Sequence, residues 1–284
     1  MRVAKYIKGW FPLFGLPAFL AFALAFLVPF AMGLFLSFTT FRTVDDAKWV
    51  GFDNYIRAFT ENSDFINALW FTVRFTLVSV ITVNVLAFAL ALLLTRAIKG
   101  TNLFRAVFFL PNLIGGIVLG YIGQLLVNSV LGALYGQDLT YDPAYGFWGL
   151  VVLVNWQMIG YMMIIYIAAI QNIPGEVMEA AEIDAAGFWR KLFNVTIPMT
   201  ASSITICTFL TLSNCLKLFD QNLALTNGAP QNQTEGLALN IYRTFYNIRN
   251  HQGVGQAKAV VFFVFVAVIA YLQLRFTRSK EVDG

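Results

Sequence analysis

Long apolar stretches alternate with short polar segments along the chain, and several stretches exceed the ~18 residues that mark a helix able to cross a bilayer. Backbone polar groups inside hydrocarbon must find partners within their own segment, and the alternating strands of a membrane barrel are not evident in the sequence. The pattern therefore predicts an all-α integral membrane protein. We expect about six transmembrane helices, near residues 11–38, 68–95, 104–130, 147–170, 197–219 and 257–276.

Composition agrees with this pattern and narrows the class of protein. The 284 residues are 58% hydrophobic and only 12% charged, whereas a soluble domain is roughly 45–50% apolar and about 25% charged. The net charge of +4 does not indicate a nucleic-acid surface, because the basic residues are scattered at segment ends. Cys207 and Cys215 lie within one apolar segment, where we expect small hydrophobes and neither a disulfide nor a metal site.

The positions of Lys and Arg predict the orientation. They concentrate in the N-terminal tail, near residues 96–105 and 190–191, and at the C-terminal end, while the opposite loops are longer and richer in acids. The positive-inside rule then places both termini in the cytoplasm. The first apolar stretch follows basic residues as in a signal peptide, but it is longer than the roughly 7–15 residues of such a region, so we interpret it as the first helix.

The longest cytoplasmic loop in this arrangement covers residues 171–196. Pro174 suits a helix start, acidic residues follow it, and Gly187 suits a helix stop before Arg190 and Lys191. The loop should therefore form a short helix, a turn and a second short helix. Its alanines project little and permit close docking on another protein, although an amphipathic helix packed on its own bundle fits the residues equally well.

One motif in this loop resembles a known family. Glu179-Ala180-Ala181, then Asp184, Gly187 and Ile197-Pro198 are similar to the EAA loop of binding-protein-dependent ABC importer permeases. The sequence departs from that pattern at Ala185, where the sugar-transporting branch usually has Gly, and at Ile197, where Leu is commoner. We expect Ala185 to make the loop slightly stiffer.

The resemblance extends along nearly the whole chain. Residues 49–55 (WVGFDNY), 104–111 (FRAVFFLP) and 225–230 (LTNGAP) resemble the carbohydrate branch, the last being similar to the F-type half of a maltose permease, which usually has Gly where Ala229 stands. The resemblance implies the type I ABC importer permease fold. It divides the chain into residues 1–66 (tail, first helix and first outer loop), 67–278 (transmembrane domain of five helices, with the EAA loop at about 173–198) and 279–284 (cytoplasmic tail).

The resemblance also implies partners. The loop would sit in a cleft of a separate ABC ATPase, with coupling residues Glu179, Ala180, Ala181, Asp184 and Gly187. A dimer of that ATPase, a second homologous permease subunit and an extracytoplasmic solute-binding protein would complete the importer. No Walker A pattern occurs in the sequence, so we expect ATP and Mg on the ATPase, no cofactor or metal on this chain, and no catalytic residue.

Polar side chains within the apolar spans are candidates for a substrate path, because they are costly in contact with lipid. Thr211 and Asn214 share one face of the fifth span, and Gln157 and Tyr161 lie one turn apart on the fourth. By resemblance, Tyr161 falls where the maltose-type subunit contacts its sugar. Gln124 is a further candidate. The alternative is that these groups only bridge helices inside the bundle.

Residues 226–255 are rich in Asn, Gln, Gly and Thr and show no apolar face. We expect an outer loop that contacts the binding protein, or else a solvated linker.

The resulting hypothesis is a permease subunit that imports an oligosaccharide or related polyol by alternating access in the bacterial cell membrane. An ABC permease for an amino acid, peptide or ion is the alternative, because the EAA loop occurs in those importers too. An intramembrane enzyme would need paired catalytic groups at membrane depth, and a channel would need a filter-like segment; neither is evident in the sequence.

Overall fold

The computed structural model describes residue 13 and residues 15–61, 64–96 and 99–278. The start of the first predicted span and the predicted tail 279–284 lie outside these residues. The chain divides into two compact units, one formed by residues 1–62 and 241–262 and the other by residues 63–240 and 263–284.

The predicted all-α membrane architecture is confirmed. Five helices are long and apolar enough to cross a membrane, or six if one bent pair forms a single span. They cover Gly15–Leu36, Asp64–Leu94, Gly116–Tyr135, Pro143–Gln171 and Gln252–Arg275, with Phe188–Met199 and Ala201–Leu216 as the bent pair. The strands among the described residues are two-residue pieces, β1 (Thr39–Thr40) and β2 (Lys48–Trp49), which pair antiparallel.

The first unit is built around this small hairpin. The hairpin follows η1 (Ala23–Leu27) and α2 (Val28–Leu36) and precedes α3 (Asp53–Thr60), with η2 (Val44–Asp46) in its turn. Asn54 is buried and donates to the carbonyls of Ser37 and Thr39, each at 2.9 Å. Gly253 in α14 (Gln252–Arg278) packs so closely that a Cβ there would overlap the Thr39 carbonyl oxygen. The Asn54 amide thus satisfies one backbone acceptor of the hairpin and one just before it.

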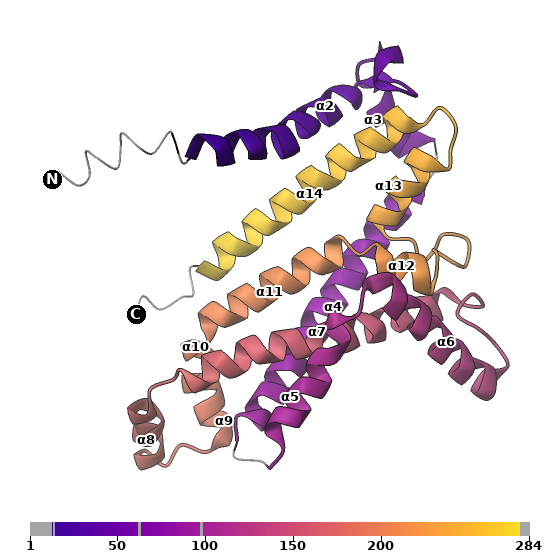
Figure 1. Cartoon of the computed structure of the whole chain (residues 1–284). Helices are drawn as coiled ribbons and strands as arrows, with labels where there is room; N and C mark the ends of the chain where they lie inside the picture. The colour runs from indigo at the N-terminus through magenta and orange to yellow at the C-terminus, as the bar shows by residue number, and fades with distance from the viewer. Residues whose placement is uncertain (1–12, 14, 62–63, 97–98, 279–284) are drawn as a thin grey trace, which may run out of the picture. The chain divides into compact units, whose positions relative to one another are not determined.

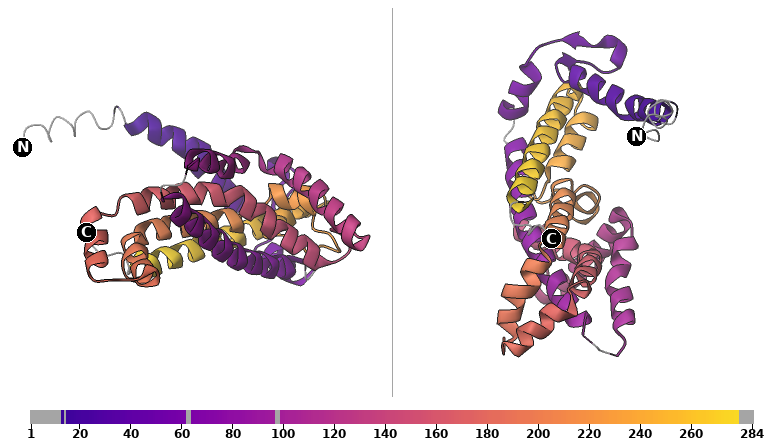
Figure 2. Two further views of the ribbon diagram at one scale, coloured as in Figure 1. Left: turned by 90° about the horizontal axis from the view of Figure 1, so that it is seen from below. Right: turned by 90° about the vertical axis from the view of Figure 1, so that its left-hand side faces the viewer.

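The second unit centres on α4 (Asp64–Leu94), α7 (Pro143–Gln171) and α11 (Ala201–Leu216), which run side by side (Figures 1 and 2). Phe71 and Phe75 of α4 meet the ring of Phe147 edge-on, at centroid distances of 6.0 and 6.3 Å. Polar pairs also join α7 to α4. Tyr166 donates its hydroxyl to Asn84 at 2.6 Å, the kind of interhelical bond that stabilises membrane bundles.

The third predicted span, residues 104–130, is wrong as a single helix. The chain forms α5 (Thr101–Phe109), a 3-10 turn η3 (Leu110–Leu113) and then α6 (Gly116–Tyr135). Pro111 lacks a backbone donor and lies in the first turn of η3, and Gly115 is extended before α6 begins. These two residues end one helix and allow the next to leave in a new direction.

The fifth predicted span is also interrupted. A π-helical turn η4 (Leu192–Thr196) and α10 (Ile197–Met199) lead to a 72° bend before α11. Pro198 removes one helical donor, and the Thr200 hydroxyl donates to the Thr196 carbonyl at 2.7 Å. At its other end, α11 stops at Leu216, and a break leads to α12 (Asp220–Leu225).

The interpretation of residues 226–255 as a loop without an apolar face is wrong. The tract contains α13 (Leu237–Tyr246), in which Leu237 and Leu239 are fully buried, and the start of α14. The polar segment before α13 folds around buried Asn222, which donates to the Thr234 carbonyl at 2.7 Å and accepts from the Gly236 amide at 2.8 Å. Internal hydrogen bonds therefore satisfy residues whose polarity suggested solvent exposure.

Candidate functional site

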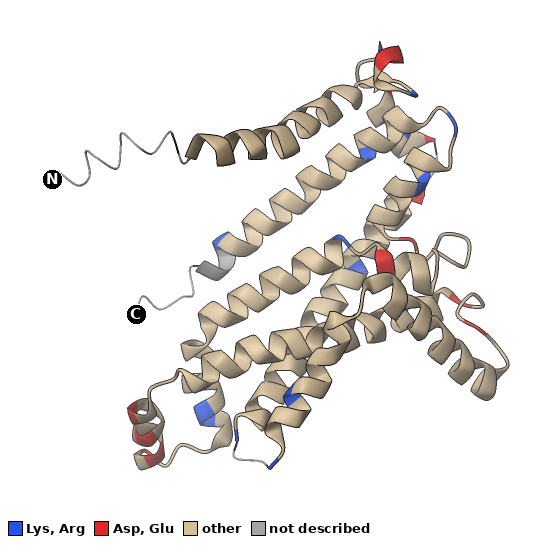
Figure 3. Cartoon of the chain, viewed as in Figure 1, with Lys and Arg blue, Asp and Glu red and all other residues tan. Residues whose placement is uncertain are grey.

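The predicted helix–turn–helix in residues 171–196 is confirmed as a structure. It consists of α8 (Gly175–Ile183), which follows Pro174, and α9 (Phe188–Lys191). The Lys191 ammonium donates to Glu182 Oε1 at 2.8 Å and joins the two helices. This ion pair lowers the pKa of the Glu182 carboxyl. Figure 3 shows the acidic residues of α8 gathered beyond the long helices of the second unit, which carry few charges.

The turn itself differs from the prediction. Ala185, and not Gly187, adopts the left-handed conformation, with φ of 51°. The Ala186 amide donates to the Ala181 carbonyl and the Ala185 amide to the Glu182 carbonyl, both at 3.0 Å. This is the Schellman arrangement, which usually has Gly at the position of Ala185. The expectation that Gly187 ends the first helix was therefore wrong by two positions.

Gly187 has an ordinary extended backbone, with φ of −66° and ψ of 169°, and precedes α9. A Cβ built there would have no described atom within 4 Å. Nothing in the conformation or packing of the described chain therefore requires glycine at this position.

The predicted coupling residues lie close together at this end of the second unit. Glu179, Ala180, Asp184 and Gly187 are exposed, and Ala181 is half-buried. The apolar side chain of Ile183 is 86% exposed. Among the described elements, α8 packs mainly against η4. Most of its surface is therefore open to another protein, and its own bundle covers little of it.

A polar pocket of about 390 Å³ lies elsewhere in the second unit, where two helices are interrupted. It brings together three of the residues predicted for the substrate path: Gln157 and Tyr161 from α7 and Asn214 from α11. The break between α11 and α12 adds Lys217 and Asp220. The full lining consists of Asn112, Val154, Gln157, Met158, Tyr161, Asn214, Lys217, Leu218, Phe219, Asp220 and Gln221.

Amides, a phenol and the charged side chains of Lys217 and Asp220 supply hydrogen-bonding groups in this pocket. Gln221 donates its amide to Gln157 Oε1 at 2.6 Å, and this fixes one wall. Asn214 is exposed, and its Nδ2 donates to the Leu210 carbonyl one turn back at 2.9 Å. Tyr161 is 38% exposed, with its ring 6.5 Å from that of Phe109. The pocket thus offers both hydrogen-bonding groups and an accessible aromatic ring.

Glycines position the walls of the pocket. Gly160 of α7 packs on the backbone of α5 so tightly that a Cβ would overlap the Phe108 carbonyl. In α6, a Cβ at Gly116 would lie 2.7 Å from the Asp220 Cβ, and one at Gly120 would lie 2.5 Å from the Ala224 Cβ. Small residues four apart allow such close approach of helices in membranes. The broken helices α5–α6 and α11–α12 therefore reach the pocket through contacts that only glycine permits.

The other two predicted path residues lie outside the pocket. Thr211 is fully buried, donates to the Cys207 carbonyl at 2.8 Å and accepts from Asn84 Nδ2 at 3.3 Å. Gln124 of α6 donates to the Leu225 carbonyl at 3.0 Å. Both side chains join helices in this structure.

Sequence reasoning did not assign Asn112, Asp220 or Gln221 to the site. The available signal was the pair of chain breaks. Pro111 and Gly115 in the sequence predict one of these breaks. Because irregular backbone at membrane depth is tolerated where it lines a cavity, a predicted break indicates a site.

Comparisons with known proteins agree with this architecture. Residues 101–282 match the family described as binding-protein-dependent transport system inner membrane component. The chain is 40% identical to the "Probable starch degradation products transport system permease protein AmyD" of Thermoanaerobacterium thermosulfurigenes, over 99% of each chain. It is 30% identical to the "Multiple sugar-binding transport system permease protein MsmF" of Streptococcus mutans, over 90% of this chain and 91% of the relative.

The fold is also similar to a solved structure, described as a bacterial ABC transporter involved in the import of the acidic polysaccharide alginate. The TM-score is 0.82 at 20% identity, over 98% of this chain and 99% of the other. With five or six candidate spans, the chain is a multi-pass membrane protein. It belongs to the family of inner membrane components of binding-protein-dependent transport systems, which are transport permease subunits.

Proposed function

We propose that this chain is one of two membrane-spanning subunits of an ATP-driven importer, and that it translocates an oligosaccharide or related polyol delivered by an extracytoplasmic binding protein. The observation that carries the proposal is the polar pocket at the two helix breaks, in which Gln157, Tyr161 and Asn214 converge. Relatives named for starch degradation products and for multiple sugars support the substrate class.

The chemistry of the pocket suits a sugar. Amide groups both donate and accept hydrogen bonds, as the hydroxyl groups of a sugar do. The exposed ring of Tyr161 offers an apolar surface for the C–H face of a pyranose. The volume of about 390 Å³ falls in the range of roughly 300–1,000 Å³ typical of small-molecule sites.

Coupling to ATP is proposed for α8. Glu179, Ala180, Ala181, Asp184 and Gly187 would contact the ATPase, which would hold ATP and Mg. Their small or acidic side chains leave a surface open to a partner, and a carboxylate makes stronger hydrogen bonds than a neutral acceptor. Import then requires two arrangements of the bundle that the ATPase and the loaded binding protein stabilise to different degrees.

The orientation follows from charge. Arg190 and Lys191 lie in α9, the helix after α8, and the Arg96 guanidinium carbon lies 5.8 Å from the centroid of the Phe188 ring in α9. Basic residues favour the cytoplasmic side. We therefore propose that α8 and both termini are cytoplasmic in a bacterial cell membrane, and that the opposite end receives the binding protein.

Reconstitution tests the proposal. The chain, a second permease, the ATPase and candidate binding proteins would be placed in proteoliposomes, and ATP hydrolysis and solute uptake measured for a panel of solutes. We expect an oligosaccharide to stimulate both activities in the presence of its binding protein. Stimulation by an amino acid, a peptide or an ion, with none by any sugar, would contradict the proposed substrate.

One observation favours a second candidate. Lys217 and Asp220 place opposite charges in the pocket, which also suits a zwitterionic solute such as an amino acid or short peptide. The same panel separates the two functions, because a neutral oligosaccharide and a zwitterion would not both stimulate the complex.

A further inference from the structure

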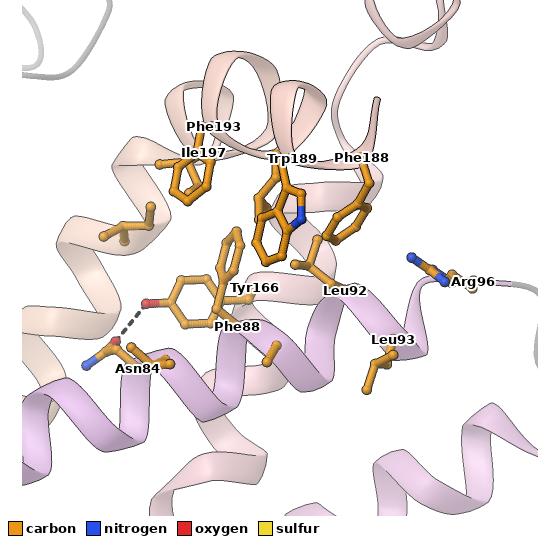
Figure 4. Close-up of a pocket in the computed structure, with 14 residues that line it drawn as sticks. Asn84, Phe88, Leu92, Leu93, Arg96, Tyr166, Phe188, Trp189, Phe193 and Ile197 are labelled. Carbon is orange, nitrogen blue, oxygen red and sulfur yellow. Dashed lines mark hydrogen bonds between the residues drawn. The ribbon is translucent and has the colours of Figure 1, made fainter. Parts of the chain in front are cut away.

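A second cavity, of about 660 Å³, opens between α4, α7 and the segment that runs from α9 to the start of α11. Its lining residues all differ from those of the polar pocket. Figure 4 shows Phe188, Trp189 and Phe193 on one side of this space and Phe88 and Tyr166 on the other. Most of the remaining lining is aliphatic and includes Leu92 of α4.

The interior of this cavity is apolar, and the polar side chains of Asn84 and Tyr166 in it have partners within the protein. Tyr166 donates its hydroxyl to Asn84 Oδ1 at 2.6 Å, as the dashed line in Figure 4 shows. Asn84 Nδ2 donates to the Val80 carbonyl at 2.8 Å and lies 3.3 Å from the Thr211 hydroxyl. A sugar or a cluster of water molecules would lose hydrogen bonds on entering such a space. The interior therefore suits a hydrocarbon chain.

The mouth of the cavity is different, because it carries a cation and aromatic rings. Arg96 follows the end of α4, is exposed, and lies with its guanidinium carbon 5.8 Å from the centroid of the Phe188 ring. Nearby Arg105 donates to the Leu94 carbonyl at 2.9 Å, so that guanidinium is engaged at the helix end. Arg96 is the one charged side chain among the described residues that line the cavity.

The aromatic rings indicate the depth of this mouth in the membrane. Trp189 and Phe193 stack at 6.1 Å, and the Trp189 side chain is 67% exposed. Trp is enriched where hydrocarbon meets the headgroup layer. An apolar cavity that ends at a cation in this layer matches a molecule with an acyl tail and an anionic head.

We propose that this cavity binds an acyl chain of an anionic phospholipid, with its phosphate on the Arg96 guanidinium. Acyl chains are the solvent of a membrane-spanning bundle, and basic sites between spanning helices bind acidic headgroups. The bound lipid would span from α4 to α9 and η4, and η4 is the element against which α8 packs. Lipid binding would therefore stabilise the arrangement that holds the α8–α9 loop against the bundle.

Native mass spectrometry of the full-length chain in detergent tests the headgroup contact, with phosphatidylglycerol and phosphatidylcholine of identical acyl chains as probes. We expect one retained phosphatidylglycerol and about fivefold weaker retention of phosphatidylcholine, the factor that corresponds to about 1 kcal/mol per basic residue at an anionic surface. Arg96→Gln should abolish this preference. Arg190→Gln, which changes an exposed arginine of α9 outside the lining, should leave the preference intact.

A second pair of variants tests the tail. Leu92→Trp fills the cavity from α4 and should remove the retained lipid, whereas Leu125→Trp changes a 70% exposed residue of α6 outside the lining and should not. Equal retention of the two lipids by the wild-type chain, or an unchanged preference in Arg96→Gln, would overturn the proposal. So would a complex in which a protein helix fills the cavity. The test needs no transport, so its result is independent of the proposed substrate.

Discussion

The glycines near the polar pocket are required by packing within the chain, whereas the glycine of the α8–α9 loop is not. At the pocket, Gly116, Gly120 and Gly160 each face another part of the same chain at a distance that excludes a side chain. In the loop, Gly187 has an ordinary backbone conformation and no described atom within 4 Å of its Cβ position. The pocket glycines are therefore explained by the fold, whereas a need for glycine at residue 187 would have to come from a partner.

The largest expected effect is that of Gly160→Ala. The new Cβ would overlap the Phe108 carbonyl, so α5 and α7 must separate. Overpacking of this kind costs about 1–3 kcal/mol or more, and the pocket wall would move with it. We expect a lower melting temperature of the purified chain and loss of uptake in proteoliposomes.

Gly175→Ala is the matched control, because no described atom lies within 4 Å of the Cβ position at that residue. It should leave the melting temperature within error of the wild type. A Gly160→Ala chain as stable as Gly175→Ala would contradict the close α5–α7 contact.

Glu179→Lys should abolish uptake and leave the fold intact. The side chain is exposed on α8, so its own chain loses no packing, but the charge presented to an ATPase is reversed. Uptake and sugar-stimulated ATP hydrolysis would be measured beside insertion and melting temperature. Wild-type uptake by this variant would remove α8 from the coupling surface.

Gly187→Ala also tests whether the α8–α9 loop contacts the ATPase. The backbone at this position accepts alanine, and the described neighbours leave room for its methyl group. We expect an unchanged melting temperature together with weaker association of the ATPase, measured by co-purification. An unchanged association would show that the glycine is needed by neither the fold nor the partner.

In the pocket, Asn214→Ala should raise the sugar concentration required for transport by about two- to twelvefold, the factor that corresponds to one hydrogen bond of about 0.5–1.5 kcal/mol. The Asn214 amide is exposed and donates only to a carbonyl of its own helix among the described residues, so stability should change little. The measurement is uptake against sugar concentration.

Thr211→Val on the same helix should change stability and leave the sugar dependence of transport unchanged. It removes an interhelical hydrogen bond to Asn84 and should lower the melting temperature without changing the sugar concentration required. If both variants altered only stability, the bridging interpretation would apply to Asn214 as well.

The sequence was sufficient to predict the unbroken spanning helices and the helix–turn–helix, because their signals are local. Apolar length defines a spanning helix, and Pro174 with the acids after it marks the start of α8. Gln157 and Tyr161 were paired because residues four apart share a helix face. Such features need no knowledge of what the helices pack against.

The remainder of the pocket depends on tertiary packing. Asn112 and Gln221 reach it only because α5–α6 and α11–α12 are broken in particular directions. Pro111 and Gly115 reveal that a break exists, but the direction is set by the contacts of Gly116 and Gly120 with α12. The partly buried α13 was missed for a similar reason, since the polar residues before it bond to one another.

The turn after α8 was mispredicted because the prediction placed it at the nearest glycine, Gly187, whereas α8 itself ends at Ile183. The left-handed position falls on Ala185, two residues before the glycine, and alanine is tolerated there at a cost of roughly 1 kcal/mol. The strain is small enough for the two backbone hydrogen bonds of the turn to hold it.

Ala185→Gly is therefore expected to have the smallest effect, and one of opposite sign to most substitutions. It relieves the left-handed strain, so exchange of the Ala186 amide, which donates to the Ala181 carbonyl, should slow by up to about fivefold. Ala180→Gly, inside α8 with a helical backbone, should instead speed it, because glycine costs about 0.5–1 kcal/mol in a helix interior. Opposite changes in the exchange rate of the Ala186 amide for the two Ala→Gly replacements would establish that the backbone conformation of the turn, and not the glycine content of the loop, sets the stiffness of the loop. If both variants exchanged faster, Ala185 would not be left-handed in the membrane protein, and the register proposed for α8 would fall with it.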